Sequence, residues 1–132
     1  MRVLDTNILV RWLVNDDPGQ AARVRALLRK ARREKRDLHI PDPVMIETVW
    51  VLESAYGLGR ESIREAMEAV VLDGSVRLDH PRRLARALDF YAYYGVGFVD
   101  AYVAVTAMEH EKGAVVSFDR GFKKLPVPWI EP

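Results

Sequence analysis

The chain of 132 residues contains no cysteine, which excludes disulfide bonds, zinc thiolate sites and thiol catalysis and allows a reducing compartment. Long apolar runs are also missing. The longest stretch without an acidic or basic residue is the ten positions 90–99, well short of the roughly 20 residues that span a bilayer. Asp5 interrupts any secretory apolar segment at the N-terminus. These absences predict a cytoplasmic protein with no membrane segment.

Charge of one sign is hardly in excess, because 20 Lys and Arg oppose 19 Asp and Glu. The basic residues are nevertheless clustered at 29–36 and again just after Asp119. Such a cluster is typical of a solvated helix end or of a contact with a polyanion, and both interpretations stay open. The candidate contacts to a polyanionic substrate or to a protein partner are Arg29, Lys30, Arg32, Arg33, Arg120 and Lys123.

Several familiar catalytic patterns are absent. The three histidines lack metal-ligand spacing, no phosphate-binding loop occurs, and the segment Gly95-Val96-Gly97 lacks the third glycine of a dinucleotide site. A serine nucleophile elbow is also missing. The large aromatic residues are interpreted as core or subunit-interface residues rather than as base-stacking surfaces; they are Trp12, Trp50, Tyr91, Tyr93 and Tyr94.

Apolar periodicity and capping residues predict alternating strands and helices. The expected strands are 2–4, 38–40, 76–78, 114–118 and 127–130, and the expected helices are 8–14, 18–36, 44–56, 61–72, 81–94 and 98–112. Asp17 and Asp42 each precede a proline and are interpreted as helix caps. Strands joined by helical crossovers imply a mostly parallel sheet of about five strands. The chain is therefore expected to form one three-layer α/β/α domain over residues 1–132.

Four carboxylates are placed where a strand ends or a helix begins: Asp5, Glu47, Asp100 and Asp119. The carboxyl ends of parallel strands share one edge of a sheet, so these side chains are expected to converge on one cleft. Two carboxylates about 4 Å apart repel by roughly 4 kcal/mol at an effective dielectric near 20, and bound cations would relieve that repulsion. Oxygen ligands suit Mg²⁺ or Mn²⁺. The sequence therefore predicts an acidic metal site.

Glu47 is the most telling of the four, because a glutamate in an otherwise apolar, buried helix is costly unless it is paired or binds a metal. The remaining carboxylates are interpreted as caps, turn residues or a solvated helix face, with Asp42 and Asp79 the two most open to another role. Thr6, Asn7 and Ser117 lie close enough in sequence to the four to hydrogen-bond them or to orient a water. Capping remains the alternative for Thr6 and Asn7, and a sheet hydroxyl for Ser117.

Four segments together resemble a known family. They are Val3-Leu4-Asp5-Thr6-Asn7-Ile8-Leu9-Val10, Ile46-Glu47-Thr48-Val49-Trp50-Val51-Leu52, Phe98-Val99-Asp100-Ala101 and Ser117-Phe118-Asp119-Arg120-Gly121-Phe122 followed by Leu125. In order and spacing they resemble the PIN-domain ribonucleases and, more narrowly, the VapC toxins of type II toxin–antitoxin modules. The similarity covers the whole chain.

The resemblance implies an endoribonuclease that depends on one or two Mg²⁺ or Mn²⁺ ions, with Asp5, Glu47, Asp100 and Asp119 as catalytic metal ligands and Thr6, Asn7 and Ser117 in support. It implies a toxin that inhibits translation by cutting transfer or ribosomal RNA, a small antitoxin partner and a homodimer. Two alternatives stay open. One is a PIN nuclease that acts in RNA processing rather than as a toxin, and the other is a non-enzymatic binding domain.

Overall fold

All residues from 1 to 132 are described by the structure, a computed structural model. Five strands are present: β1 (Arg2–Val3), β2 (Leu38–Ile40), β3 (Val76–Leu78), β4 (Val115–Val116) and β5 (Trp129–Ile130). Every pairing is parallel, as predicted, but the strands form two sheets, one in the order β1-β2-β3 and one made of β4 and β5. The number of strands is as expected, but the strands are only two or three residues long and form two sheets instead of one.

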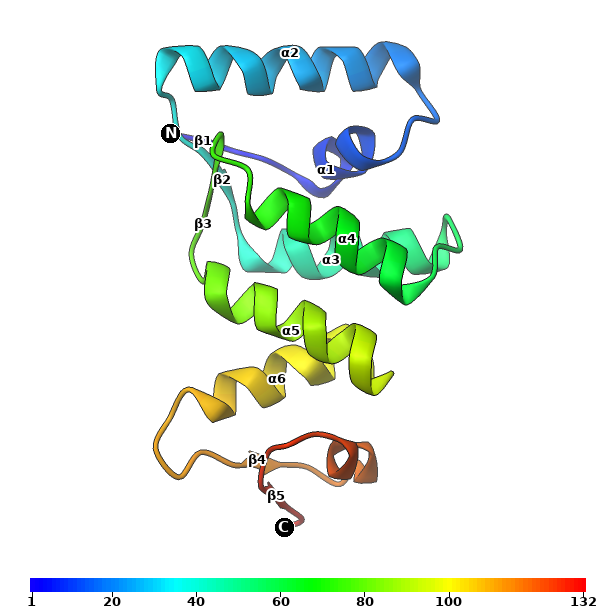
Figure 1. Cartoon of the computed structure of the whole chain (residues 1–132), viewed down its shortest axis with the longest axis vertical. Helices are drawn as coiled ribbons and strands as arrows, with labels where there is room; N and C mark the ends of the chain where they lie inside the picture. The colour runs from blue at the N-terminus through cyan, green and yellow to red at the C-terminus, as the bar shows by residue number, and fades with distance from the viewer.

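The helices confirm the predicted alternation (Figure 1). They are α1 (Thr6–Leu13), α2 (Pro18–Glu34), α3 (Asp42–Ser54), α4 (Arg60–Val71), α5 (Pro81–Tyr94) and α6 (Phe98–Met108), with a 3₁₀ helix, η1 (Arg120–Lys124). The Asp17 side chain accepts a hydrogen bond from the backbone N–H of Gln20 and caps α2, as expected. Helix α6 is shorter than predicted, because a turn that leads to Gly113 follows Met108.

Asp42 does not cap α3, which corrects the sequence interpretation. Pro41 holds the N-cap position, makes no side-chain cap, and Asp42 is the first helical residue. Its buried carboxylate instead accepts hydrogen bonds from Nδ1 of His80 and from the hydroxyl of Tyr102. The partners lie 38 and 60 residues away in sequence, so only the folded chain reveals them.

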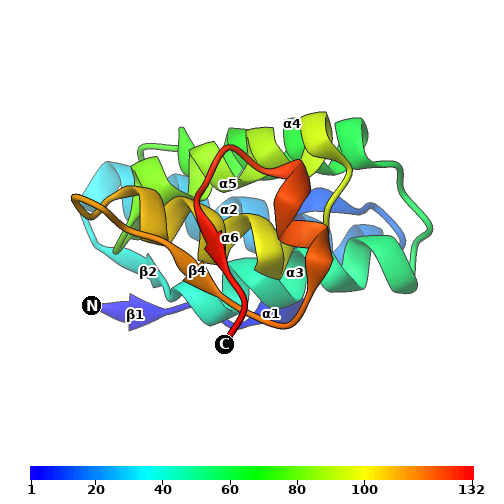
Figure 2. The ribbon, with the colours of Figure 1, turned by 90° about the horizontal axis from the view of Figure 1, so that it is seen from below.

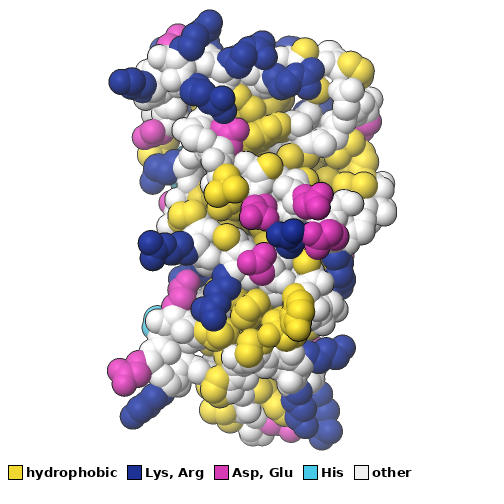
Figure 3. Space-filling model, in the orientation of Figure 1, with side chains coloured by type: hydrophobic (Ala, Val, Ile, Leu, Met, Phe, Trp, Pro, Cys, Tyr) yellow, Lys and Arg dark blue, Asp and Glu magenta, His cyan; other side chains and the backbone are white.

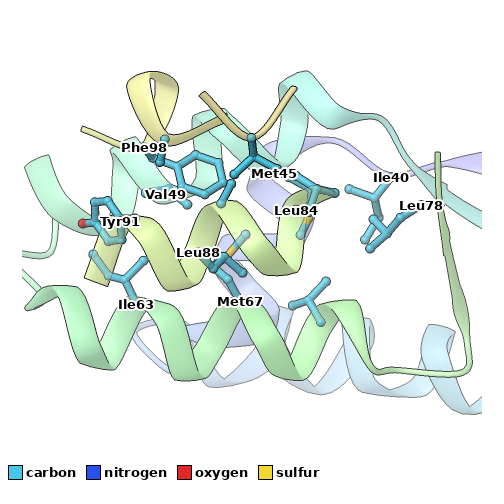
Figure 4. Packing of buried hydrophobic residues seen from close by; sticks show 14 of the residues in the cluster. Ile40, Met45, Val49, Ile63, Met67, Leu78, Leu84, Leu88, Tyr91 and Phe98 are labelled. Carbon is cyan, nitrogen blue, oxygen red and sulfur yellow. The ribbon is translucent and has the colours of Figure 1, made fainter. Parts of the chain in front are cut away.

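The core lies between the strands and the helices that cover them. Helix α5 packs on both α4 and α6, and Figure 2 shows α4 and α5 on the side of the molecule opposite β1 and β2. Figure 4 shows Ile63, Met67 and Leu88 meeting where α4 faces α5. A fully buried side chain of this kind stabilises the fold by about 1.5–3 kcal/mol. No helix combines the length and the apolar character that crossing a membrane requires.

Aromatic residues divide between core and surface. Tyr91 is fully buried, which confirms the core interpretation for that residue, and its ring meets Phe98 edge to face. Trp50 and Tyr93 are 66% and 81% exposed, so neither belongs to the core. Helix α3 is apolar nearly all round, but only one side of it faces the core. Another side presents Trp50 to solvent.

Candidate active site

Asp5 and Glu47 line one pocket of about 330 Å³ between α1 and α3. Asp5 follows β1 and its Oδ1 accepts the backbone N–H of Thr6 at 2.7 Å, which fixes the carboxylate at the start of α1. Glu47 lies in the second turn of α3. Glu47 is not buried, contrary to the prediction from the sequence, because its side chain is exposed at this pocket. The structure thus brings the carboxylates of Asp5 and Glu47 together at the surface rather than in the core.

Arg11 is the one basic side chain in this pocket, and its guanidinium is already engaged. Its Nε donates to Oε1 of Gln20 at 2.6 Å, and its Nη1 lies 3.2 Å from Oδ1 of Asp16. Neither Asp5 nor Glu47 takes part in any ion pair of the chain. Their negative charges are therefore left for a ligand from outside the chain.

Asp100 lies in the first turn of α6 and lines a second pocket, of about 250 Å³, between α6 and α3. Partial burial raises the pKa of this carboxyl, and the negative charge of Asp119 raises it further. No cation acts in the opposite direction. Asp100 and Asp119, although 19 positions apart, therefore lie close enough to repel each other.

The turn between β4 and η1 sets the position of Asp119. Its Oδ1 accepts the backbone N–H of Gly121 at 2.8 Å, and its own backbone N–H donates to Oγ of Ser117 at 2.9 Å. Ser117 thus shapes the backbone that presents Asp119. Figures 1 and 2 show β4 beside α6, which agrees with the electrostatic proximity of Asp119 to Asp100.

Helix α3 borders both pockets. Glu47 and Val51 line the pocket shared with α1, and Ile46, Trp50 and Glu53 line the pocket shared with α6. Asp5 and Glu47 therefore share one pocket beside α3, whereas Asp100 lines the other and Asp119 lies near Asp100. No three Asp, Glu or His side chains converge closely enough to form a ready metal site. The donors suit a hard cation because all are carboxylates, and the uncompensated repulsion at Asp100 is what a bound divalent cation would relieve.

Comparison with known proteins decides the family. The PIN domain family model matches residues 2–128, nearly the whole chain. The chain belongs to the PIN domain family. It is also 28% identical over 132 residues to a VapC ribonuclease of Aquifex aeolicus (strain VF5), an alignment that covers all of this chain and 97% of that protein.

The candidate RNA or partner contacts of this PIN domain fall into two groups. Those of the 29–36 run lie on and just after the last turns of α2, which agrees with a solvated helix end. Figure 3 shows basic side chains gathered over α2. Within the 29–36 run, Nη2 of Arg32 lies 3.1 Å from Oδ1 of Asp73. Arg120 and Lys123 are exposed on η1, directly after Asp119, and Nζ of Lys123 lies 5.2 Å from the ring centroid of Trp129. Only this second group adjoins a predicted catalytic carboxylate.

Two residues beside Asp100 were not among the candidates predicted from the sequence. Trp50 and Glu53 both line the pocket with Asp100. A signal for Trp50 existed, because a residue three positions after Glu47 lies on the same side of a helix one turn on. Thr6 is buried at the start of α1, and Asn7 is exposed in the pocket beside Asp5.

Proposed function

We propose that this PIN domain is a metal-dependent endoribonuclease whose catalytic carboxylates are Asp5, Glu47, Asp100 and Asp119. The observation that carries the proposal is the placement of Asp5 with Glu47 in one pocket and of Asp100 near Asp119, because none of these four carboxylates makes an ion pair within the chain. The charge of Asp119 also adds to the raised pKa of Asp100. Perturbed carboxylates of this kind gather at functional sites. Similarity to a VapC ribonuclease along the full length supports the choice of RNA as substrate.

The four carboxylates would hold one or two Mg²⁺ or Mn²⁺ ions. Such an ion, when bound, lowers the pKa of a water and stabilises the charge that develops on a phosphoryl group. The chain itself contributes position: Thr6 fixes the Asp5 carboxylate through its backbone N–H, and Ser117 fixes the backbone at Asp119. Asn7 is exposed in the pocket of Asp5, and in this proposal it would orient a water there.

The biological role proposed is that of the toxin in a VapBC-type pair, which inhibits translation by cutting transfer or ribosomal RNA and is held in check by a small antitoxin. This role, the homodimer and the cytoplasmic location rest on similarity to the VapC family. A PIN nuclease that serves RNA processing is the second candidate. A small antitoxin gene next to the gene for this chain, and a product that binds the chain and blocks cleavage, would favour the toxin. A non-enzymatic binding domain is less well supported because all four acidic positions are filled.

The test is cleavage of end-labelled transfer and ribosomal RNA fragments with Mg²⁺, with Mn²⁺ and with excess EDTA. Wild-type protein should give discrete products that are absent in EDTA and with Asp100→Asn. Asp37→Asn is the matched control, because Asp37 is exposed and its side chain makes no ion pair. Equal cleavage by wild type and Asp100→Asn would overturn the assignment.

A further inference from the structure

Trp50 stands beside the proposed catalytic groups without being part of the core. It is 66% exposed on α3, one helical turn after Glu47, and it lines the pocket that contains Asp100. A tryptophan left this exposed forgoes much of the free energy that its burial would supply. A ligand that covers the indole would recover that free energy, and the position of Trp50 makes the ligand a neighbour of the reacting phosphate.

The walls of this pocket are mainly apolar. Phe98 and Val49 are buried beneath it, and Figure 4 shows these two side chains next to each other where α6 meets α3. Val99, 56% exposed, adds a further apolar surface. No lysine or arginine lines the pocket. A phosphate group therefore finds no counter-charge here, and a flat, uncharged group is the better fit.

Glu53 gives the pocket one fixed polar side. Its Oε1 accepts a hydrogen bond from the hydroxyl of the buried Tyr91, while Oε2 makes no hydrogen bond within the chain. Tyr91 is itself held in place, because the Arg60 guanidinium lies 4.5 Å from its ring centroid and donates to its carbonyl oxygen at 2.9 Å. The carboxylate of Glu53 is thus oriented in advance, with one oxygen free to accept a hydrogen bond.

We propose that this pocket binds the RNA base next to the scissile phosphate, with the base stacked on Trp50 and the exocyclic amino group of the base donating to Glu53. The inference rests on the proposed ribonuclease function and adds a base preference to it. Stacking on an aromatic side chain accepts any base. A carboxylate that accepts from an exocyclic amino group favours guanine, cytosine or adenine over uracil, which has no such group.

Binding measured without cleavage tests the proposal. Wild-type protein in EDTA is titrated with single-stranded oligo(A), oligo(C) and oligo(U) of equal length, followed by fluorescence anisotropy and by quenching of tryptophan emission. Trp50→Ala should weaken binding roughly 5- to 150-fold, which corresponds to about 1–3 kcal/mol for one stacked base. Trp50→Phe keeps a smaller ring, so it should retain part of the affinity and lose the quenching due to Trp50.

Tyr93→Ala is the matched control, because Tyr93 is an aromatic residue 81% exposed on α5 that does not line the pocket. It should bind like wild type. Glu53→Gln should reduce the preference for oligo(A) and oligo(C) over oligo(U) while leaving oligo(U) affinity nearly unchanged. The pocket would instead serve a protein partner if Trp50→Ala bound RNA as tightly as wild type, and that result overturns the proposal. So would the absence of saturable RNA binding by wild type.

Experiments can distinguish a failure of this inference from a failure of the proposed function. Metal-dependent cleavage that is lost in Asp100→Asn, together with unchanged binding and unchanged cleavage sites in Trp50→Ala, refutes the base pocket and leaves the nuclease standing. Cleavage that persists in Asp100→Asn refutes the catalytic assignment, whatever the oligonucleotides show. Circular dichroism of each variant confirms that the fold is intact.

Discussion

Asp42 and Asp100 occupy equivalent places, each in the first turn of a helix, but in opposite electrostatic surroundings. Asp42 is 9% exposed, and its Oδ2 accepts hydrogen bonds from His80 and Tyr102. Asp100 is half-buried, and both causes that act on its pKa disfavour its charge. The Oδ1 atom of Asp42 is buried without a hydrogen-bond partner, so the Asp42 carboxylate is partnered at one oxygen only. A carboxylate held by such partners is typical of a structural role, and one without a partner is typical of a functional site.

The two carboxylates are also connected. Tyr102 follows Asp100 by two residues in α6 and donates to Asp42 at the start of α3. Arg83 of α5 donates to the same hydroxyl at 3.1 Å and pairs with Glu109 at 2.6 Å. This network holds α3, α5 and α6 together. It therefore fixes α6, which carries Asp100, against α3, which carries Glu47.

The largest expected difference between the two carboxylates is in catalysis. Loss of a residue that only orients a metal ligand typically costs 10- to 100-fold, so Asp100→Asn should lower the cleavage rate at least about 100-fold. Asp42→Asn should act only through position and cost less. Cleavage rates at saturating Mg²⁺ measure both. The contrast fails if Asp42→Asn is as inactive as Asp100→Asn while remaining folded.

Stability should show the reverse order. Asp42→Ala leaves Tyr102 and His80 without their acceptor and should lower the free energy of unfolding by about 1–3 kcal/mol. Asp100→Asn should not lower it at all. Urea denaturation of both variants against wild type measures the difference, and a loss of stability in Asp100→Asn would contradict the view of Asp100 as an uncompensated charge.

Sequence patterns were sufficient where the cause was local. The Asp17-Pro18 cap and the bounds of β2, β3 and α5 follow from neighbouring residues, and they were predicted correctly. The partners of Asp42 were missed because His80, the N-cap residue of α5, and Tyr102 of α6 come close to Asp42 only after folding. Glu47 was misjudged because an apolar helix was taken to be buried on all sides, whereas α3 presents Glu47 and Trp50 to solvent. Trp50 is therefore not a core residue, and its interpretation as a subunit-interface residue stays a prediction. The four catalytic assignments themselves stay predictions.

The salt dependence of RNA binding should distinguish the basic residues of η1, which follow Asp119, from those at the end of α2. Each phosphate contact to single-stranded RNA contributes about 0.7 to the slope of log K against log salt, so removing two contacts should flatten the slope by about 1.4. Arg120→Gln with Lys123→Gln should do so, because both residues adjoin Asp119. Arg29→Gln with Arg33→Gln on α2 removes the same charge and should leave the slope unchanged. Equal flattening by both pairs would mean that RNA also follows α2.

The smallest effect expected is a difference in how stability depends on pH. The folded pKa of Asp100 is raised above its ordinary value of 3.8, so the ionised form is disfavoured by folding. The cost of that charge is absent below about pH 3.8, grows as pH rises through the raised pKa, and is removed in Asp100→Asn. This variant should therefore be more stable than wild type near neutral pH, by less than about 1 kcal/mol, and equal to it in acid.

Glu109, which belongs to the Asp42 network, should change the pH dependence of stability in the direction opposite to Asp100. Its hydrogen bonds with Arg83 lower its folded pKa below the ordinary 4.5, so its contribution to stability is present above that pH and is lost as pH falls through the lowered value. Glu109→Gln should be less stable than wild type at neutral pH, with the difference vanishing in acid. Urea denaturation of wild type and both variants from pH 3 to pH 7 would give two differences of opposite sign. Differences of the same sign would show that Asp100, like Asp42, is held by a compensating partner.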